Sequence, residues 1–386
     1  MLDGVSVALG ISGSIAAVKV VELAHELRRQ GAAVRGVMTE SAQGIIHPWA
    51  VEFATENDVV TEITGRVEHV ELCGRDGWAD VLLLAPATAN TVGKIAGAVD
   101  DTPVTTCATT ALGADVPVVI APAMHEPMYD HPGVIEALDR VESWGVTFAD
   151  PRIEEGKAKI ATEAAIVTET ARATRAQSLA GHHVVVTAGA TAEAIDPVRI
   201  LTNRASGKTG RAVARACHVR GADVTLVHPG GDVHYADAVT AESAAEMHDA
   251  VLAHTDSDTD AVVSAAAISD YTVEAASEKL RSGEARTLEL EPTPKLLDAV
   301  REGHPDLPIV GFKAETSGDD SAMIEAARAI LDRVGLAFVV ANDASVMGVD
   351  ATRALFVESD DVIEFSGSKI ELGARVAERL AAAVTE

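Results

Sequence analysis

The sequence predicts an α/β protein with two doubly wound, mostly parallel-sheet, Rossmann-like domains. Short β-rich apolar runs alternate with amphipathic stretches of helical length, a pattern typical of a parallel sheet with helices on both faces. This alternation stops and begins again near residue 180. A length of 386 residues also agrees with two domains at roughly 150 residues each.

The first half begins directly with a strand and a helix. The predicted helix Ser14–Gln30 ends before Gly31, a residue suited to the left-handed position that follows many helices. A polar, Ala-rich helix over about Glu163–Ala180 closes this half, so the predicted domains are residues 1–180 and 181–386. The strands expected here are Val5–Ile11, Ala33–Thr39, Val81–Ala85 and Val116–Ala121.

The second half repeats the opening of the first without an alignable repeat. A strand leads into a Gly-rich loop and then into the helix Gly207–Arg220, which ends at Gly221. A hairpin over Ala354–Phe365 and a last helix from Ser368 onward complete the prediction. The other strands expected here are His183–Ala188, Asp223–His228, Asp260–Ala267, Pro308–Phe312 and Ala337–Ala341.

The charge balance excludes one broad class of function. The chain has 31 Lys and Arg against 59 Asp and Glu, a net charge of −28, and such a surface repels phosphate backbones. We therefore expect no nucleic-acid partner. The acids recur along the whole chain, which predicts a halophilic protein whose self-repulsion is screened by salt; an ordinary acidic protein is the alternative.

Cysteine usage and the N-terminus indicate the compartment. Three cysteines at long spacings give no disulfide framework and no metal-binding knuckle. The first residues lack the basic charges of a signal peptide, and no apolar run approaches the ~18 residues of a membrane span. We expect a cytoplasmic protein without a membrane partner.

The loop Gly10–Ala16 lies between the first predicted strand and helix, where small residues let backbone N–H groups hold a phosphate. Alone it fits a flavin site, a dinucleotide site or a tight structural turn. Thr39 and Ser41 follow the second strand, at the edge where α/β proteins bind ligands, while Glu40 could instead hold a ribose.

Three further segments carry a resemblance. Val81–Gly93 reads VLLLAPATANTVG, Ala121–Tyr129 reads APAMHEPMY, and Val67–Asp80 reads VEHVELCGRDGWAD. Together with the opening loop they resemble the flavin-dependent cysteine decarboxylases, a family that includes phosphopantothenoylcysteine decarboxylases. The resemblance implies that FMN is the cofactor. It also implies the flavin-binding residues, namely Gly13, Ser14, Thr39, Ser41, Thr88, Ala89 and Asn90.

The same resemblance implies the catalytic and substrate-binding residues of this half. His69 matches the catalytic histidine, and an imidazole near neutral pKa can accept a proton while a flavin accepts a hydride. His125 and Met128 match the substrate clamp, although His125 replaces an asparagine of the family. Residues 151–160 match a flap that carries a cysteine in many bacterial members. Here the flap has none, so Lys159 is the proposed proton donor, with Lys157 and Cys73 as alternatives.

The second half contains Ser206–Thr209, which suggests a phosphate-binding P-loop. The first glycine of that motif would fall at position 202, which is Thr202, so a P-loop is rejected. Arg199 and Lys208 beside a helix start still suit a phosphorylated ligand, while a Rossmann-type redox domain is the alternative.

The ordered segments DPVR, TNRASGK, SAAAISDY, EK, VGFKAET and VAND resemble phosphopantothenate–cysteine ligases over about residues 182–386. The whole chain is thus similar to bifunctional enzymes with the decarboxylase first. The resemblance implies catalytic roles for Asn203 and Lys279. It also implies substrate-binding roles for Arg199, Ser264, Ala265, Ala266, Asp270, Pro294, Lys295, Leu296, Leu297 and Phe312, with Asn342 and Asp343 in the VAND segment.

The resemblance implies a function in coenzyme A biosynthesis. 4′-Phosphopantothenate would be joined to cysteine with CTP, and the product would be decarboxylated with FMN to 4′-phosphopantetheine. Mg²⁺ is expected with the triphosphate, although the metal ligands cannot be named from the sequence, and a homo-oligomer with a trimeric decarboxylase core is implied. The alternatives are a flavin-binding regulatory protein of the same fold and an NAD(P)-dependent reductase, against which the missing G-x-G-x-x-G argues.

Overall fold

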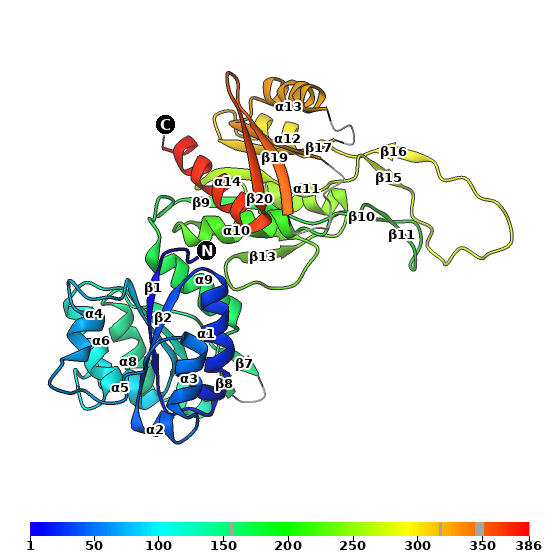
Figure 1. The fold of residues 1–386 in the computed structure, drawn as a ribbon. Helices are drawn as coiled ribbons and strands as arrows, with labels where there is room; N and C mark the ends of the chain where they lie inside the picture. The colour runs from blue at the N-terminus through cyan, green and yellow to red at the C-terminus, as the bar shows by residue number, and fades with distance from the viewer. Residues whose placement is uncertain (155–156, 316–318, 344–350, 386) are drawn as a thin grey trace. The chain divides into compact units, whose positions relative to one another are not determined.

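The computed structural model describes residues 1–154, 157–315, 319–343 and 351–385, except for the side chains of residues 154, 157, 315, 343 and 351. The chain forms two compact units, Met1–Ala176 and Gln177–Glu386 (Figure 1). These are called the N-terminal and C-terminal units below. The division lies at Ala176, slightly before the predicted boundary at residue 180.

A five-stranded parallel sheet forms the centre of the N-terminal unit. Its order is β2-β1-β3-β4-β6, the arrangement of flavodoxin-like doubly wound folds. All four predicted strands are present, and the short β6 adds an edge. The bounds are β1 Ser6–Ile11, β2 Ala33–Met38, β3 Val81–Ala87, β4 Val118–Pro122 and β6 Thr147–Phe148.

Helices cover both faces of this sheet, which explains why the residues of β3 and β4 are buried on both sides. One face carries α1 Val20–Arg29, α3 Pro48–Thr55 and α9 Glu163–Thr174. The other carries α4 Glu68–Cys73, α5 Ala89–Ala96, α6 Pro103–Gly113 and α8 Pro132–Glu142, whose apolar residues form one core cluster with the sheet.

Two predicted helices differ from the structure. The first begins as a 3-10 turn, η1 Ile15–Lys19, before α1 continues it. The helix expected to reach Ala180 ends at Thr174. Its predicted last turn is wrong because Leu179 is fully buried in the core of the C-terminal unit, where its N–H donates to the Arg220 carbonyl at 2.8 Å.

A small antiparallel sheet lies beyond the end of β4. Its order is β5-β8-β7, with bounds β5 Met124–His125, β7 Arg152–Glu154 and β8 Lys157–Lys159. Met124 pairs with Ala158, so the predicted substrate clamp and the predicted flap form one structure. The short helices α2 Glu40–Gln43 and α7 Glu126–Tyr129 follow β2 and β5.

The C-terminal unit is built on an eight-stranded sheet of order β13-β12-β9-β14-β17-β18-β19-β20. Its first six strands are parallel and the last two form the predicted antiparallel hairpin. The parallel part has the order of a Rossmann fold. The bounds are β9 His183–Thr187, β12 Asp223–His228, β13 Asp237–Thr240, β14 Thr259–Ser264, β17 Ile309–Glu315, β18 Phe338–Asp343, β19 Ala351–Val357 and β20 Val362–Ser368.

Two helices, α10 Lys208–Val219 and α14 Lys369–Ala383, pack side by side on one face of this sheet (Figure 1). A Cβ on Gly373 would lie 2.6 Å from the Ala212 carbonyl oxygen, so this glycine permits their close approach. The other face carries α11 Ala244–Ala253, α12 Leu296–Gly303 and α13 Asp320–Val334.

Two small antiparallel ribbons extend from the sheet: β10 Ala192–Ala194 with β11 Ile200–Thr202, and β15 Tyr271–Val273 with β16 Leu290–Pro292. Among the described residues, no helix is both long and apolar enough to cross a bilayer.

Candidate active sites

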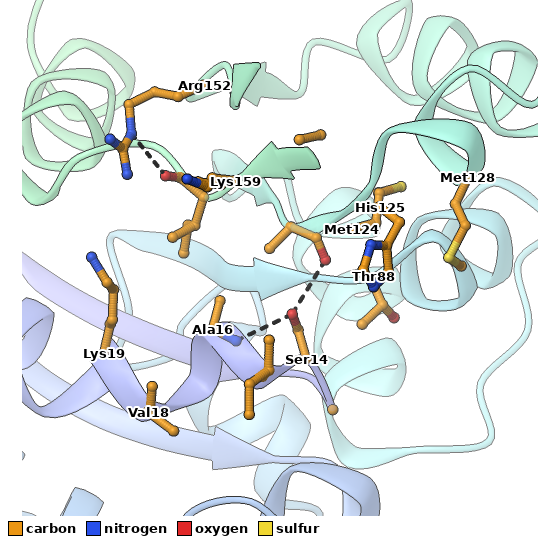
Figure 2. Close-up of a pocket in the computed structure, with 15 residues that line it drawn as sticks. Ser14, Ala16, Val18, Lys19, Thr88, Met124, His125, Met128, Arg152 and Lys159 are labelled. Carbon is orange, nitrogen blue, oxygen red and sulfur yellow. Dashed lines mark hydrogen bonds between the residues drawn. The ribbon is translucent and has the colours of Figure 1, made fainter. Parts of the chain in front are cut away.

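An open cavity of about 720 Å³ lies at the carboxyl edge of the N-terminal sheet (Figure 2). It is formed by the loop after β1, the residue after β3, the β4–β5 segment and the β7–β8 flap. This is the edge where ligands bind in open α/β sheets. The lining residues are Gly13, Ser14, Ile15, Ala16, Val18, Lys19, Thr88, Ala123, Met124, His125, Met128, Arg152, Ala158, Lys159 and Ile160.

Helix starts supply the polar groups of this cavity. Ser14 caps η1 by accepting a hydrogen bond from the Ala16 N–H at 3.3 Å, and its hydroxyl donates to the Ala123 carbonyl at 3.3 Å (Figure 2). Thr88 caps α5 by accepting from the Thr91 N–H at 3.2 Å. Backbone N–H groups at such helix starts favour an anion.

The remaining predicted flavin residues are not among those that line the cavity, but they adjoin lining residues. Thr39 caps α2, and its hydroxyl lies 3.0 Å from that of Ser41. A Cβ on Gly13 would lie 2.4 Å from the Ser41 Oγ, so a glycine is required where these loops touch. Ala89 and Asn90 form the first turn of α5, directly after Thr88.

The donor set fits a phosphorylated ring cofactor such as FMN. Hydroxyls and helix N-termini can hold the phosphate, and Lys19, Arg152 and Lys159 add positive charge. Apolar side chains make up the rest, including Ile15 and Val18, which are 78% and 57% exposed. An amphipathic lining of this kind and volume is typical of cofactor sites.

His69 is not among the residues that line the cavity. It lies on α4, which packs against α6 on the sheet face opposite α1 and α9. Its Nδ1 atom is buried and has no hydrogen-bond partner in the part of the chain that the structure describes. A single chain therefore leaves the predicted catalytic histidine outside the cavity lined by the predicted residues Gly13, Ser14, Thr88, His125, Met128 and Lys159.

Two of the three candidate proton donors occupy different environments, and the side chain of the third, Lys157, lies outside the described residues. Lys159 is on β8 and lines the cavity, whereas Cys73 is fully buried in the core on the α4 side of the sheet. Hydrogen bonding to Cys73, followed by burial, raises the pKa of the neighbouring Cys107 thiol far above its usual range. Cys73 is thus part of a packed pair of thiols away from the cavity.

The C-terminal unit has a smaller cavity of about 240 Å³. It lies at the carboxyl ends of β9, β14 and β17 and beside the N-terminus of α10, again at a topological switch point. A Cβ on Gly210 would lie 2.7 Å from the Thr187 carbonyl oxygen, so α10 begins close against the strand end. The lining residues are Gly189, Ala205–Gly210, Ala265–Ile268, Phe312–Ala314, Asn342, Thr352, Lys369 and Leu372.

Several predicted ligase residues meet at this cavity. Ala265, Ala266 and Phe312 line it, and Ser264 is the buried last residue of β14 directly below. The Asn203 Nδ2 donates to the Ala267 carbonyl at 2.7 Å, while its Oδ1 accepts from the Ala205 N–H at 2.9 Å. Asn203 therefore ties together two of the loops that form the wall.

The carboxylate of Asp196 links Arg199 to the segment that carries Lys279. Asp196 accepts hydrogen bonds from the N–H groups of Val198 and Arg199, both at 2.8 Å, and Leu280, at 3.1 Å, and its carboxylate pairs with the Arg199 guanidinium. Burial raises its pKa, but these hydrogen bonds outweigh burial and lower the pKa to about 2. Arg199 also donates to the Leu280 carbonyl at 3.0 Å, next to the exposed Lys279.

The other predicted substrate residues lie apart from the cavity. Asp270 and Lys295 form an exposed ion pair at 2.6 Å. Leu296 is 4% exposed in the core at the start of α12, with Leu297 packed against it and the exposed Pro294 shortly before it. Asp343 is outside the described side chains. Sequence reasoning missed Thr352, Lys369 and Leu372, which the last strands and α14 bring to the cavity.

The comparisons with known proteins identify the family. The flavoprotein family profile matches residues 1–175, and the profile described as the DNA/pantothenate metabolism flavoprotein C-terminal domain matches residues 179–384. The chain is 49% identical over 364 residues to the coenzyme A biosynthesis bifunctional protein CoaBC of Thermococcus kodakarensis, covering 93% of this chain and 90% of that protein. The chain belongs to the bifunctional CoaBC family.

A second curated relative agrees with this assignment. The CoaBC protein of Methanocaldococcus jannaschii is 34% identical over 386 residues, covering 98% of this chain and 94% of that protein. Among solved structures, the C-terminal domain of a CoaBC protein is 29% identical with a TM-score of 0.46, covering 54% of this chain and 99% of that one.

Membership of this family establishes the function at the level of the two activities. The chain is a bifunctional enzyme of coenzyme A biosynthesis, a phosphopantothenoylcysteine decarboxylase and a phosphopantothenate–cysteine ligase. Its N-terminal domain is a flavoprotein domain. The predicted fold and the predicted pair of activities are confirmed, and they take the place of the regulatory-protein and reductase alternatives.

Proposed function

We propose how the residues of each unit carry out these activities. In the N-terminal unit, Gly13, Ser14 and Thr88 hold FMN, supported by Thr39, Ser41, Ala89 and Asn90 around them. The observation that carries this proposal is the convergence of two capped helix starts on one amphipathic cavity. When bound, FMN supplies two-electron oxidation of the cysteinyl thiol and returns the electrons after CO₂ has left.

The residues of the chain itself bind the substrate and move protons. His69 acts as the acid–base group toward the cysteinyl end of the substrate. His125 is exposed at the cavity and donates a hydrogen bond to the substrate carboxylate or amide, with Met128 packing against the chain of the substrate. Lys159 on the flap donates a proton to the enethiol intermediate that decarboxylation leaves.

We propose that the decarboxylase works as a homo-oligomer with a trimeric core, in which a neighbouring copy supplies His69. Its support is the position of His69 outside the cavity of its own chain. Ile15 at the cavity and Val70 next to His69 are exposed apolar side chains, which fits a contact between protein chains at both positions.

Complementation tests this arrangement. His69→Asn and His125→Ala are each expected to be inactive as decarboxylases, and mixing the two should restore part of the CO₂ release because some sites then combine an intact His69 with an intact His125. Restoration requires exchange of subunits, so co-expression is the method. Co-expressed pairs no more active than the single variants would contradict a shared site.

In the C-terminal unit, we propose that CTP binds at the cavity lined by Ala265, Ala266 and Phe312, above Ser264. The carboxylate of 4′-phosphopantothenate attacks the α-phosphate, pyrophosphate leaves, and the amine of cysteine then displaces the nucleotide. Lys279 stabilises the developing negative charge, as a positioned ammonium does beside phosphates. Arg199 holds the Lys279 segment in place through its bonds to Asp196 and Leu280.

Asn203 orders the loop beside the acyl-nucleotide, and Asp270 and Lys295 border the substrate. Mg²⁺ accompanies the triphosphate; among the described residues no group of three His, Cys, Asp or Glu side chains forms a metal cage, which suits an ion held largely by phosphates. Pyrophosphate release should require 4′-phosphopantothenate and CTP, fall with ATP, and stop with EDTA. Equal rates with ATP would overturn the nucleotide choice.

We also propose that the enzyme works in the cytoplasm of a salt-adapted cell. The net charge of −28 supports this, because salt screens repulsion between surface carboxylates. Both activities should rise as KCl increases from 0.1 M to about 2 M. A maximum at 0.1 M would contradict the salt adaptation while leaving both activities in place.

A further inference from the structure

A second cavity of about 310 Å³ lies in the C-terminal unit between α10, α14 and the segment that carries Tyr235. Four of its lining residues are cationic, and no acidic residue lines it. In a chain with a net charge of −28, this concentration of positive charge is unusual. The lining residues are Lys208, Arg211, Ala212, Arg215, Tyr235, Ser368, Lys369 and Ile370.

The N-termini of two helices add positive electrostatic potential at this cavity. Lys208 is the first residue of the twelve-residue α10, and Lys369 is the first residue of the fifteen-residue α14. Both helices thus begin at the cavity, where their N-terminal dipole ends favour negative charge. The carboxylate nearest in sequence, Glu371, is engaged with the cap of its own helix, accepting from the Ser368 N–H at 2.7 Å.

Arg215 and Arg211 are not neutralised by any carboxylate among the described residues. The Arg215 guanidinium is partly buried, and burial lowers its pKa, with Tyr235 acting in the opposite direction. No carboxylate among the described residues lies within ion-pair distance of Arg215 or Arg211. Partly buried guanidinium groups without a carboxylate are suited to an external oxyanion, which they bind in a bidentate manner.

The cavity is next to the proposed nucleotide cavity, since Lys208 and Lys369 line both. The ligase chemistry produces an anion of matching charge there. When the carboxylate oxygen bonds to the α-phosphorus, the bond to the bridging oxygen breaks and pyrophosphate leaves with the electron pair. At neutral pH, pyrophosphate carries roughly three negative charges, comparable with the four cations of this lining.

We propose that the cavity lined by Lys208, Arg211, Arg215, Tyr235 and Lys369 is a binding site for inorganic pyrophosphate, the leaving group of the ligase reaction. Lys208 and Lys369 pass the anion from the nucleotide cavity to Arg211 and Arg215. This inference rests on the proposed ligase mechanism but not on the identity of the nucleotide, because ATP and CTP release the same pyrophosphate.

Direct binding tests the site without turnover. The full chain is titrated with sodium pyrophosphate in a calorimeter, and we expect one site per chain. Arg215→Gln should weaken binding roughly tenfold or more, because it removes a charge-assisted pair of hydrogen bonds. Arg328→Gln, on the exposed surface of α13, is the matched control and should bind as tightly as the parent.

A second measurement uses product inhibition in the ligase assay at the working salt concentration. Arg215→Gln should raise the pyrophosphate concentration needed for half inhibition by a similar factor while the KM for the nucleotide changes little. Unchanged pyrophosphate affinity in Arg215→Gln, or no pyrophosphate binding by the parent protein, would overturn the proposal. A ligase that works with another nucleotide would overturn only the nucleotide choice above.

Discussion

Replacing Asn203 by aspartate separates a role in ligation from a role in folding. The Asn203 Nδ2 donates to the Ala267 carbonyl at 2.7 Å, and Ala267 lines the proposed nucleotide cavity. Asn203→Asp removes that donor and puts a carboxylate oxygen against a carbonyl oxygen. The Oδ1 bond from the Ala205 N–H can remain, so the loop loses one of its two ties.

The structure limits the cost to folding. Asn203 is exposed, and one neutral hydrogen bond is worth about 0.5–1.5 kcal/mol, so the free energy of unfolding should fall by about 1 kcal/mol. The effect on ligation should be larger, because a displaced loop and an added negative charge both act on the acyl-nucleotide. We expect ligation to fall at least tenfold, equivalent to about 1.4 kcal/mol at the transition state.

The assay exploits the two activities of one chain. Pyrophosphate release and ligated product are measured together, and we expect pyrophosphate release to continue while product formation stops. Decarboxylation of supplied phosphopantothenoylcysteine should be unchanged, which reports that the chain is folded. Arg204→Gln, an exposed neighbour without the tie to Ala267, is the control. Normal ligation by Asn203→Asp would refute the reasoning, as would an equal loss in Arg204→Gln.

Four other changes test the remaining assignments. His69→Asn should retain FMN, since His69 is outside the cavity, but lower CO₂ release by about 10²-fold or more; activity within a few-fold of the parent would make His69 structural. Cys73→Ser should leave decarboxylation within a few-fold, whereas Lys159→Ala should slow it and change the single-turnover flavin absorbance at 450 nm; the reverse pattern would exchange their roles. Fragments 1–176 and 177–386 should fold separately as a flavoprotein and a ligase, and failure of both to fold would contradict the division into units. The pKa of Asp196 is lowered from 3.8 to about 2, so the stabilisation by its ionised carboxylate is complete above about pH 4 and is lost as the pH falls toward 2. Limited proteolysis near residue 280 should therefore increase as the pH falls from about 4 to about 2. In Asp196→Asn, the same cleavage should already occur at neutral pH.

The fold could be predicted because its signals are local. Buried parallel strands appear as continuous apolar runs, and glycines such as Gly31 and Gly221, both in left-handed conformations, mark where helices end. The end of α9 could not be predicted in this way. Helix propensity continues past Thr174, but Leu179 gains more by packing in the core of the C-terminal unit.

The candidate sites were only partly predictable for a related reason. Strand-end residues line one cavity because parallel strands end at one edge of a sheet, as Ser14 and Thr88 do in the N-terminal unit and Ala265 and Phe312 do in the C-terminal unit. By contrast, the antiparallel pairing of Met124 with Ala158 joins the predicted substrate clamp to the predicted flap. The hydrophobic pattern of the sequence does not indicate this pairing. Leu296 shows what a motif match leaves out, because the side chain at this position predicted to bind substrate packs in the core.

The position of His69 bears on how the decarboxylase site is assembled. Its motif places an imidazole, a group suited to proton transfer, at this position. The buried Nδ1 atom has no hydrogen-bond partner among the described residues, and leaving a buried polar atom unpaired costs free energy. This imidazole lies on α4, away from the predicted flavin residues at the start of η1 and α5, which is why we propose that a neighbouring copy completes the decarboxylase site. The cavity is open, with Ile15 and Val18 largely exposed at its mouth. A second copy of the chain could cover the exposed Ile15 and Val18 and at the same time bring its His69 to the cavity. We therefore expect that a variant made monomeric loses decarboxylation together with assembly.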